Sequence, residues 1–252
     1  MIDTVFDRRA FIAGAGAVIA ATAAGAANGK ARPVSTMAID HISLGVKNLF
    51  EGAARLQIET GIVGTEGSWF PEVGMANRYF RTGNSTYIEV ESVIDPYAVE
   101  SLRPAKHFVE QLRDGDRFLG WVIRVETREE LQEIASRLRS EILDSPLGQN
   151  VSGGPRANYV RTPETFSCWS RGLPNFIYWD QKPKPITPGP VIPTGIAWLE
   201  VGGTEQRMRD WIGNDITRLP LRFNGKELGV HAVAIQVEGR VIEVRRPPIT
   251  PL

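Results

Sequence analysis

This sequence has only one cysteine, and it lacks the long basic runs that are typical of nucleic-acid-binding proteins. The single cysteine, Cys168, rules out a disulfide within the chain, and a lone cysteine is most often a small buried apolar side chain. Lysine and arginine number 29 against 29 acidic residues, with no long basic run. The electrostatic footprint of a polyphosphate-binding protein is therefore missing, and we expect no nucleic-acid partner.

Several catalytic motifs are missing as well. A glycine-rich phosphate-binding turn follows a strand, whereas the one Gly-Ala-Gly run, at residues 14–16, precedes every predicted strand. No nucleophile elbow and no paired-cysteine metal motif occurs. These absences argue against a nucleotide cofactor and against hydride transfer.

The first thirty residues are typical of an export signal. Residues 7–12, DRRAFI, precede an uncharged Ala/Gly-rich stretch that runs to Ala27, and the arrangement resembles a twin-arginine signal. Small residues such as Ala24 and Ala26 suit a signal peptidase. We therefore predict a signal over residues 1–31, the twin-arginine translocase as a transient partner, and the periplasm as the final location.

A membrane anchor is the alternative for this stretch. An anchor needs about 20 strongly apolar residues to cross the hydrocarbon. The stretch is short and diluted by glycine, so cleavage is favoured and no stable membrane span is expected. Because twin-arginine signals generally serve proteins that are exported folded, often with a cofactor in place, the resemblance hints at a bound metal.

Three later segments share one layout, namely an alternating strand, a short turn and an amphipathic helix. They span residues 39–56, 118–138 and 194–211. Each unit also ends alike, in strands over residues 86–92, 175–181 and 240–246, which put Glu89, Tyr178 and Glu243 at equivalent positions. The repetition predicts three related modules.

The strands of these modules separate an apolar face from a polar one. In the first strand Ile42 and Leu44 fall on the predicted core face, while His41 and Ser43 fall on the other. Arg124 stands on the second face of the corresponding strand in the next module. Chemistry is therefore expected on the polar face.

Proline divides the modules. Residues 182–193 hold five prolines and cannot form a helix interior or a central strand. We predict modules over residues 37–93 and 117–181, which together form a domain over 37–181, then a linker over 182–193 and a third module over 194–247.

The strands DHISLGV, GNSTYIEVES, FLGWVIRVET and NFIYWD together resemble the glyoxalase-like domain of the vicinal oxygen chelate superfamily. The resemblance covers Met37 to Asp180. It implies an α+β fold in which paired βαβββ modules form an open, cup-shaped mixed sheet, to which this chain adds a third, C-terminal βαββ-like half-module. In that superfamily a divalent metal often sits in the cup as a Lewis acid, on ligands from the first and last strands of each module.

Carried over residue by residue, the resemblance gives the first module both metal ligands, His41 and Glu89. In the second module the first-strand position is Gly120, or Trp121 with a one-residue slip, and the last-strand position is Tyr178. None of these three is a usual ligand, and two ligands seldom hold a metal against water. The implied cofactor is one divalent ion of unspecified identity, at a site that lacks half of its ligands.

Three of the candidate site residues have both functional and structural interpretations. His41 is a ligand, a general base or a polar residue with a hydrogen-bonded ring. Tyr178 is an acid, a base or an oxyanion donor, or it ties its hydroxyl to the backbone. Arg124 pairs with Glu89 or binds a substrate carboxylate or enolate. The catalytic set is His41, Glu89 and Tyr178, and the substrate-binding set is Ser43, Tyr87, Arg124 and Trp169.

We expect an exported enzyme that polarises a carbonyl or enolisable carbon of a small, partly hydrophobic molecule, by isomerase, lyase or ring-opening chemistry. The first alternative is a protein that sequesters such a molecule in the same cup without turnover. The second is an inactive scaffold whose third module forms a subunit interface, as in a homodimer.

Overall fold

The computed structural model describes residues 37–70, 74–100, 103–144, 157–161, 172–180 and 189–250. Residues Ser35–Leu252 group into one compact unit. The predicted signal over residues 1–31, Cys168 and the pocket candidate Trp169 lie outside the described residues. Within the described part of the chain, no helix is long and apolar enough to cross a membrane.

The first two modules each contain a strand, a helix and three further strands. The first consists of β1 (Ala38–Gly45), α1 (Leu49–Thr60), β2 (Thr65–Phe70), β3 (Met75–Gly83) and β4 (Thr86–Val93). The second consists of β5 (Arg117–Val125), α4 (Arg128–Arg137), β6 (Glu141–Asp144), β7 (Ala157–Arg161) and β8 (Asn175–Trp179). Along the chain, the two modules are connected by two helices, α2 (Pro96–Val99) and α3 (Arg103–Gln111).

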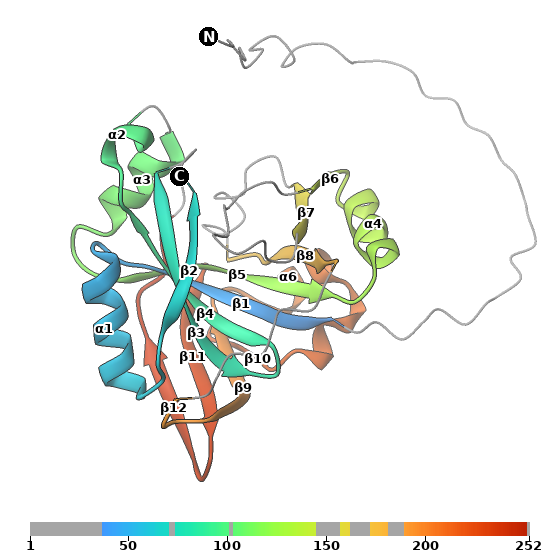
Figure 1. Cartoon of the computed structure of the whole chain (residues 1–252). Helices are drawn as coiled ribbons and strands as arrows, with labels where there is room; N and C mark the ends of the chain where they lie inside the picture. Colours follow the sequence, from blue (N-terminus) through green and yellow to red (C-terminus); the bar gives the residue numbers. More distant parts are fainter. Residues whose placement is uncertain are drawn as a thin grey trace, which may run out of the picture. The chain divides into compact units, whose positions relative to one another are not determined.

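These eight strands form one sheet in the order β2-β3-β4-β1-β5-β8-β7-β6. In each module the first strand lies parallel to the last, and β1 pairs antiparallel with β5 to join the two modules within one chain. The sheet curls into an open half-barrel, with α1 beside the first module and α4 beside the second (Figure 1). The predicted α+β fold of paired βαβββ modules is confirmed.

Local signals in the sequence set the helix ends. The side chain of Asn48 accepts hydrogen bonds from the backbone of Phe50 and Glu51 and so caps the start of α1. The helix ends at Gly61, which has a φ of 72° and therefore a left-handed conformation that suits glycine. Thr127 caps α4 in the same way as Asn48 caps α1. The short connection after each first strand thus turns directly into a helix.

The third unit builds a separate four-stranded sheet. It consists of β9 (Pro193–Val201), α6 (Glu205–Ile212), the 3-10 helix η2 (Asn214–Arg218), β10 (Leu221–Phe223), β11 (Val230–Val237) and β12 (Arg240–Arg245). The strand order is β10-β9-β11-β12. Here the first strand pairs antiparallel with β11, and the last strand lies at the edge of the sheet.

This topology corrects the predicted equivalence of Glu243 with Glu89. In the first module the last strand lies beside the first strand, whereas β12 pairs only with β11. Glu243 is exposed and pairs with Arg245. Alternation along a strand is the same whichever neighbour the strand takes, so the sequence pattern could not distinguish the two topologies.

The third unit nevertheless shares the main apolar core with the modules. Ile42 and Leu44 of β1 lie in one buried cluster with Leu199 of β9 and Val233 of β11. The guanidinium of Arg137 at the end of α4 donates to backbone carbonyls at the C-terminal end of α6, which have no partner inside their own helix. The third unit therefore helps to stabilise the sheet that carries the cup.

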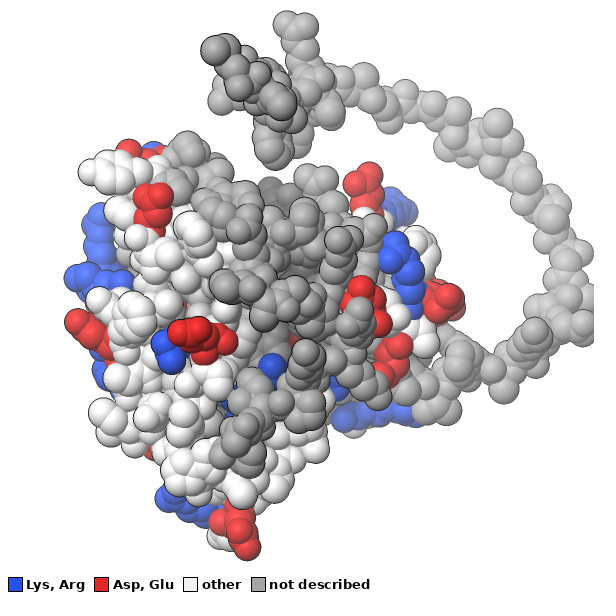
Figure 2. Space-filling view, viewed as in Figure 1, with Lys and Arg blue, Asp and Glu red and all other residues white. Residues whose placement is uncertain are grey.

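Charges on the surface are mixed. On the face shown in Figure 2, the coloured acidic and basic side chains form small, separate groups of both signs. This matches the equal numbers of acidic and basic residues in the sequence.

Candidate functional site

One face of the large sheet carries a set of polar side chains that we name the cup face. It is defined by His41 and Ser43 of β1 and by Tyr87, Glu89 and Glu91 of β4. The parallel register sets His41 beside Tyr87 and Ser43 beside Glu89. Because side chains alternate along a strand, the residues between them point into the apolar core on the other side. The predicted separation of a core face from a polar face is confirmed in β1.

An irregularity in β1 brings a further carboxylate to this face. The pairing of β1 with β5 shifts between Ile39 and His41, so Asp40 is the extra residue of a β-bulge. The bulge lets two consecutive side chains reach the same cluster, and Asp40 Oδ1 lies 2.7 Å from His41 Nδ1. Asp40 is only 1% exposed. It therefore holds the imidazole in one orientation.

The buried carboxylate of Asp40 has donors from the second module. Trp179 Nε1 donates to Asp40 Oδ2 at 3.0 Å, and Arg124 Nη1 donates to the same oxygen at 3.4 Å. Arg124 also contacts Glu126 at 3.5 Å. Of the two roles predicted for Arg124, its pairing is thus with Asp40 rather than with Glu89. The second module therefore helps to fix the position of the Asp40 carboxylate.

Glu89 lies on the other side of the imidazole. Its Oε2 is 3.3 Å from His41 Nε2, and Asn77 of β3 donates to its Oε1. The amide of Asn77 is itself held, because its oxygen accepts from the backbone N–H of Ser68. A fixed chain of contacts thus runs from Asp40 through the imidazole to Glu89 and Asn77, with the imidazole between two carboxylates.

Burial and neighbouring charges shift the ionisation of this cluster. Burial alone would lower the pKa of His41, but the charge of Glu89, the bond to Asp40 and the charge of Glu91 outweigh it, and the pKa is raised. Burial raises the pKa of Glu89, although His41 and Asn77 oppose the change. Burial and then the charge of Glu89 raise the pKa of Glu91 to about 8. At neutral pH the site therefore holds a neutral carboxylic acid at Glu91, beside an imidazole whose protonated form is favoured by its carboxylate neighbours.

Two tyrosines pack around the imidazole. Tyr87 stacks on His41 with the ring centres 4.9 Å apart, and Tyr79 meets Tyr87 edge-on at 5.1 Å. Burial, followed by the charge of Glu89, raises the pKa of Tyr79 to about 12, so its hydroxyl stays protonated. This hydroxyl lies 3.0 Å from Ser68 Oγ. The aromatic rings shield one side of the cluster from water.

The second module offers apolar side chains at the matching positions. Across the β1–β5 junction, His41 faces Val122. In β4 the partner of His41 is Tyr87, and Glu89 lies two residues further along that strand. In β8 the partner of Val122 is Asn175, and Ile177 lies two residues further along. Val122 and Ile177 are 1% and 0% exposed and form a small apolar cluster with Trp179. The cup therefore has a polar half and an apolar half.

This register corrects the sequence alignment of the second module. Gly120 faces Ser43 rather than His41, and Tyr178 pairs with Val125. Val125 belongs to the main apolar core, and Tyr178 packs against that core on the side away from the cup face. The structure thus does not bring Tyr178 to His41 and Glu89. A one-residue error in a strand moves a side chain to the other face of the sheet.

The divalent metal that the family implies does not fit these residues. One nitrogen of His41 is bonded to Asp40 and the other faces Glu89, while the second module contributes Val122 and Ile177. Among the described residues no group of three His, Cys, Asp or Glu side chains converges in a geometry that could hold a metal ion. A catalytic metal usually keeps three protein ligands. We therefore derive the chemistry from the side chains alone.

The structure thus brings together five of the predicted site residues, His41, Ser43, Tyr87, Glu89 and Arg124. The site also holds residues outside the predicted set, namely Asp40, Asn77, Tyr79, Glu91 and Trp179. Glu91 could have been found, because period two puts it on the same face as Glu89. The bulge that turns Asp40 inward has no sequence signal that we recognise.

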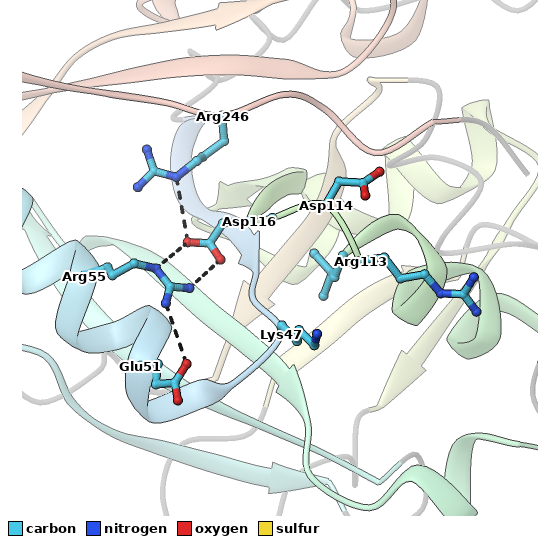
Figure 3. Close-up of a pocket in the computed structure, with 9 residues that line it drawn as sticks. Lys47, Glu51, Arg55, Arg113, Asp114, Asp116 and Arg246 are labelled. Carbon is cyan, nitrogen blue, oxygen red and sulfur yellow. Dashed lines mark hydrogen bonds and ion pairs between the residues drawn. The ribbon is translucent and has the colours of Figure 1, made fainter.

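A second, open hollow of about 590 Å³ lies beside the N-terminal half of α1, where the chain after β12 passes the start of β5 (Figure 3). Asp116 lies between two guanidiniums there: Arg55 Nη2 donates to its Oδ1 at 2.7 Å, and Arg246 Nε forms an ion pair with its Oδ2 at 4.0 Å. Arg55 also reaches Glu51 at 4.0 Å, and Arg246 pairs with Glu59. These arginines already have carboxylate partners, so we assign this hollow a structural role, tying the end of the third unit to the first module.

Solved structures show where this fold recurs. A crystal structure of a hypothetical protein from Staphylococcus aureus has a TM-score of 0.55 and 14% identity, covering 82% of this chain and 98% of that one. Methylmalonyl-CoA epimerase from Mycobacterium tuberculosis has a TM-score of 0.40 and 13% identity, covering 58% and 88%. A selenomethionine form of methylmalonyl-CoA epimerase has a TM-score of 0.40 and 18% identity, covering 58% and 96%. At 14% identity the Staphylococcus aureus protein shows a likeness of fold alone, and we draw nothing further from the two epimerases.

Sequence comparison is more specific about the family. No curated protein sequence matches the chain at a significant level. The family profile described as a glyoxalase-like domain matches residues 39–214, which is more than half of the chain and includes β1, β4, β5 and β8. The chain therefore belongs to the glyoxalase-like domain family, within the vicinal oxygen chelate superfamily.

Proposed function

We propose that the protein is an enzyme that moves a proton at an enolisable carbon of a small, partly hydrophobic carbonyl compound, as an isomerase, a lyase or a ring-opening enzyme does. The observation that carries the proposal is the imidazole of His41 held between the carboxylates of Asp40 and Glu89. Perturbed, mutually coupled acids and bases of this kind concentrate at catalytic sites.

The side chains divide the work of a proton transfer. The ionised carboxylate of Glu89 takes the proton from the carbon next to the carbonyl, which breaks the C–H bond and forms an O–H bond. His41, oriented by Asp40, compensates the negative charge of Glu89 before the transfer. The neutral carboxylic acid of Glu91 donates a hydrogen bond to the carbonyl oxygen as enolate charge develops. When the enolate turns its other face to Glu89, return of the proton there completes an isomerisation, whereas return to the original face regenerates the substrate.

The apolar half of the cup supports the description of the substrate as partly hydrophobic. Trp179, the partly exposed member of the cluster with Val122 and Ile177, offers an apolar ring that gains free energy when it contacts hydrocarbon. The same ring favours a second candidate function, in which the cup sequesters a hydrophobic compound without turnover. The two candidates differ in one observable, which is chemical change in the bound molecule.

Solvent deuterium exchange tests the proposal. The purified protein is incubated in D₂O with a panel of small ketones, aldehydes and oxo acids, and deuterium incorporation next to the carbonyl is followed by NMR. We expect catalysed exchange with at least one compound, and a loss of about 10²-fold or more in His41→Gln. Binding of panel compounds without exchange would overturn catalysis in favour of sequestration.

Export remains a prediction from the sequence, since Arg8 and Arg9 lie outside the described residues. We propose that the twin-arginine pathway carries the folded protein to the periplasm. Replacing both arginines with lysine should hold the protein in the cytoplasm, as cell fractionation and immunoblotting would show. Undiminished periplasmic accumulation of the double variant would contradict this.

A further inference from the structure

Arg81 lies on β3 at the edge of the cup face, next to the strand β4 that carries Tyr87 and Glu89. The register places it opposite Tyr87, and Tyr87 in turn lies beside His41. Its guanidinium carbon lies 5.0 Å from the centre of the Tyr87 ring and 5.7 Å from that of Tyr79. Arg81 and His41 thus lie on the two strands that flank β4, and both contact the ring of Tyr87.

The guanidinium has no anionic partner in the part of the chain that the structure describes. Its Nε is buried and makes no hydrogen bond there. Other arginines near the sheet differ, because Arg124 pairs with Asp40 and Arg55 with Asp116. Contact with the two tyrosine rings returns part of the cost of removing the charge from water, but it leaves the N–H donors of the fork unused. A partly buried, unpaired cation beside a reactive cluster is a site prepared for an anion.

The surroundings select the kind of anion. Glu89 and Asp40 bring negative charge to the same face, which disfavours a dianionic group such as a phosphate ester. One planar guanidinium fork matches one planar carboxylate through two parallel hydrogen bonds. The position therefore suits a single carboxylate.

We propose that Arg81 binds a carboxylate of the substrate, so the substrates of this site are small enolisable carboxylic acids such as oxo acids. This inference rests on the proposed function and names its substrate class. The guanidinium and the imidazole each lie within about 5 Å of the Tyr87 ring centre, so at most about 10 Å separates them. The carboxylate and the reacting carbon then belong to one compact molecule, with its hydrocarbon part toward Trp179.

Binding of matched probes tests the assignment without reference to turnover. The probes are 2-oxobutanoate, 4-oxopentanoate and 5-oxohexanoate, each with its uncharged methyl ester, and the dissociation constants are measured by ligand-detected NMR or calorimetry. We expect at least one acid to bind about tenfold or more tightly than its ester. Arg81→Met, which keeps an unbranched apolar stem and removes the charge, should abolish that preference.

Arg78→Met is the matched control. Arg78 lies on the same strand as Arg81 but on the other face, where its guanidinium lies 6.0 Å from the ring centre of Phe50. This variant should keep the preference for acids over esters. Equal binding of acids and esters by the unaltered protein, absence of binding by every acid, or a preference that survives in Arg81→Met would each overturn the assignment.

A further variant separates this inference from the proposed function. Glu89→Gln removes the proposed base but leaves Arg81 in place, so it should lose deuterium exchange and keep the preference for acids. If the unaltered protein catalyses no exchange but prefers acids through Arg81, the proposed function fails and the assignment of Arg81 stands. If exchange occurs equally on acids and esters, and both bind equally, the assignment of Arg81 fails and the proposed function stands.

Discussion

The two halves of the cup have the same backbone architecture and opposite chemistry. The first module places His41 and Glu89 on its first and last strands, and the second places Val122 and Ile177 at the corresponding positions. The polar half holds carboxylates whose ionisation is shifted by burial, while the apolar half is fully buried hydrocarbon. The comparison teaches that a duplicated fold need not keep a duplicated site. One half supplies reactive groups, and the other surrounds them with buried hydrocarbon that excludes water.

The largest expected effect contrasts the two last strands directly. Glu89→Gln removes the proposed base with little change in shape and should lower the rate of deuterium exchange by about 10²- to 10⁴-fold. The matched variant Ile177→Val at the corresponding position should change the rate by less than about tenfold, since it removes one methylene group from the apolar wall. Steady-state NMR exchange rates check both. Similar losses in the two variants would erase the contrast between the halves.

Stability should show the opposite order. Ile177→Ala removes a fully buried side chain and should lower the free energy of unfolding by about 2 to 5 kcal/mol. Glu89→Gln should cost less, because at neutral pH burial disfavours the charge that it removes. Urea denaturation followed by tryptophan fluorescence measures both. A larger loss in Glu89→Gln than in Ile177→Ala would mean that the polar half carries the fold.

The pH dependence of stability should come from the polar half. The raised pKa of Glu91 means that the folded state holds a proton which the unfolded state releases above about 4.5, so stability falls as the pH rises from there to about 8. The raised pKa of His41 acts in the same direction, because its contribution is lost as the pH rises through the folded-state pKa. Glu91→Gln should flatten the curve of Tm against pH over this window. An unchanged slope in the variant would contradict the assignment.

The smallest effect on stability and exchange is expected at Asp116, whose hollow lies outside the cup and so serves as a control for both halves. Asp116→Asn breaks the contacts with Arg55 and Arg246, and it should lower the free energy of unfolding by about 1 kcal/mol or less because Arg55 is largely exposed. The rate of deuterium exchange should not change. A strong loss of exchange in this variant would assign the hollow a part in function.

The sequence predicted the fold and most of the polar half. Period two placed His41 and Ser43 on the face away from the core, and the family resemblance added Glu89. These predictions depend on alternation within one strand, which the sequence states directly. Tyr178 was aligned with Glu89 because both close a module, but the register of β8 against β5 turns it to the core face. Register depends on contacts between distant segments and cannot be read from either strand alone.

Asp40 and Glu243 show two further limits of sequence patterns. A β-bulge turns Asp40 toward His41, where strict alternation would send it to the opposite face. Glu243 follows the same pattern as Glu89, but its strand lies at the edge of a different sheet. Both outcomes are set by how strands pair, and only the assembled sheet defines that.

The central claim is that one half of the cup performs the chemistry with its own side chains. The most direct measurement is the rate of deuterium exchange on the best panel substrate before and after dialysis against a strong divalent-metal chelator, with the metal content determined on the same samples. The account predicts an unchanged rate in metal-free protein. Loss of exchange on chelation, restored by a stoichiometric divalent ion and absent in Glu89→Gln, would contradict it and establish a metal centre on the first module.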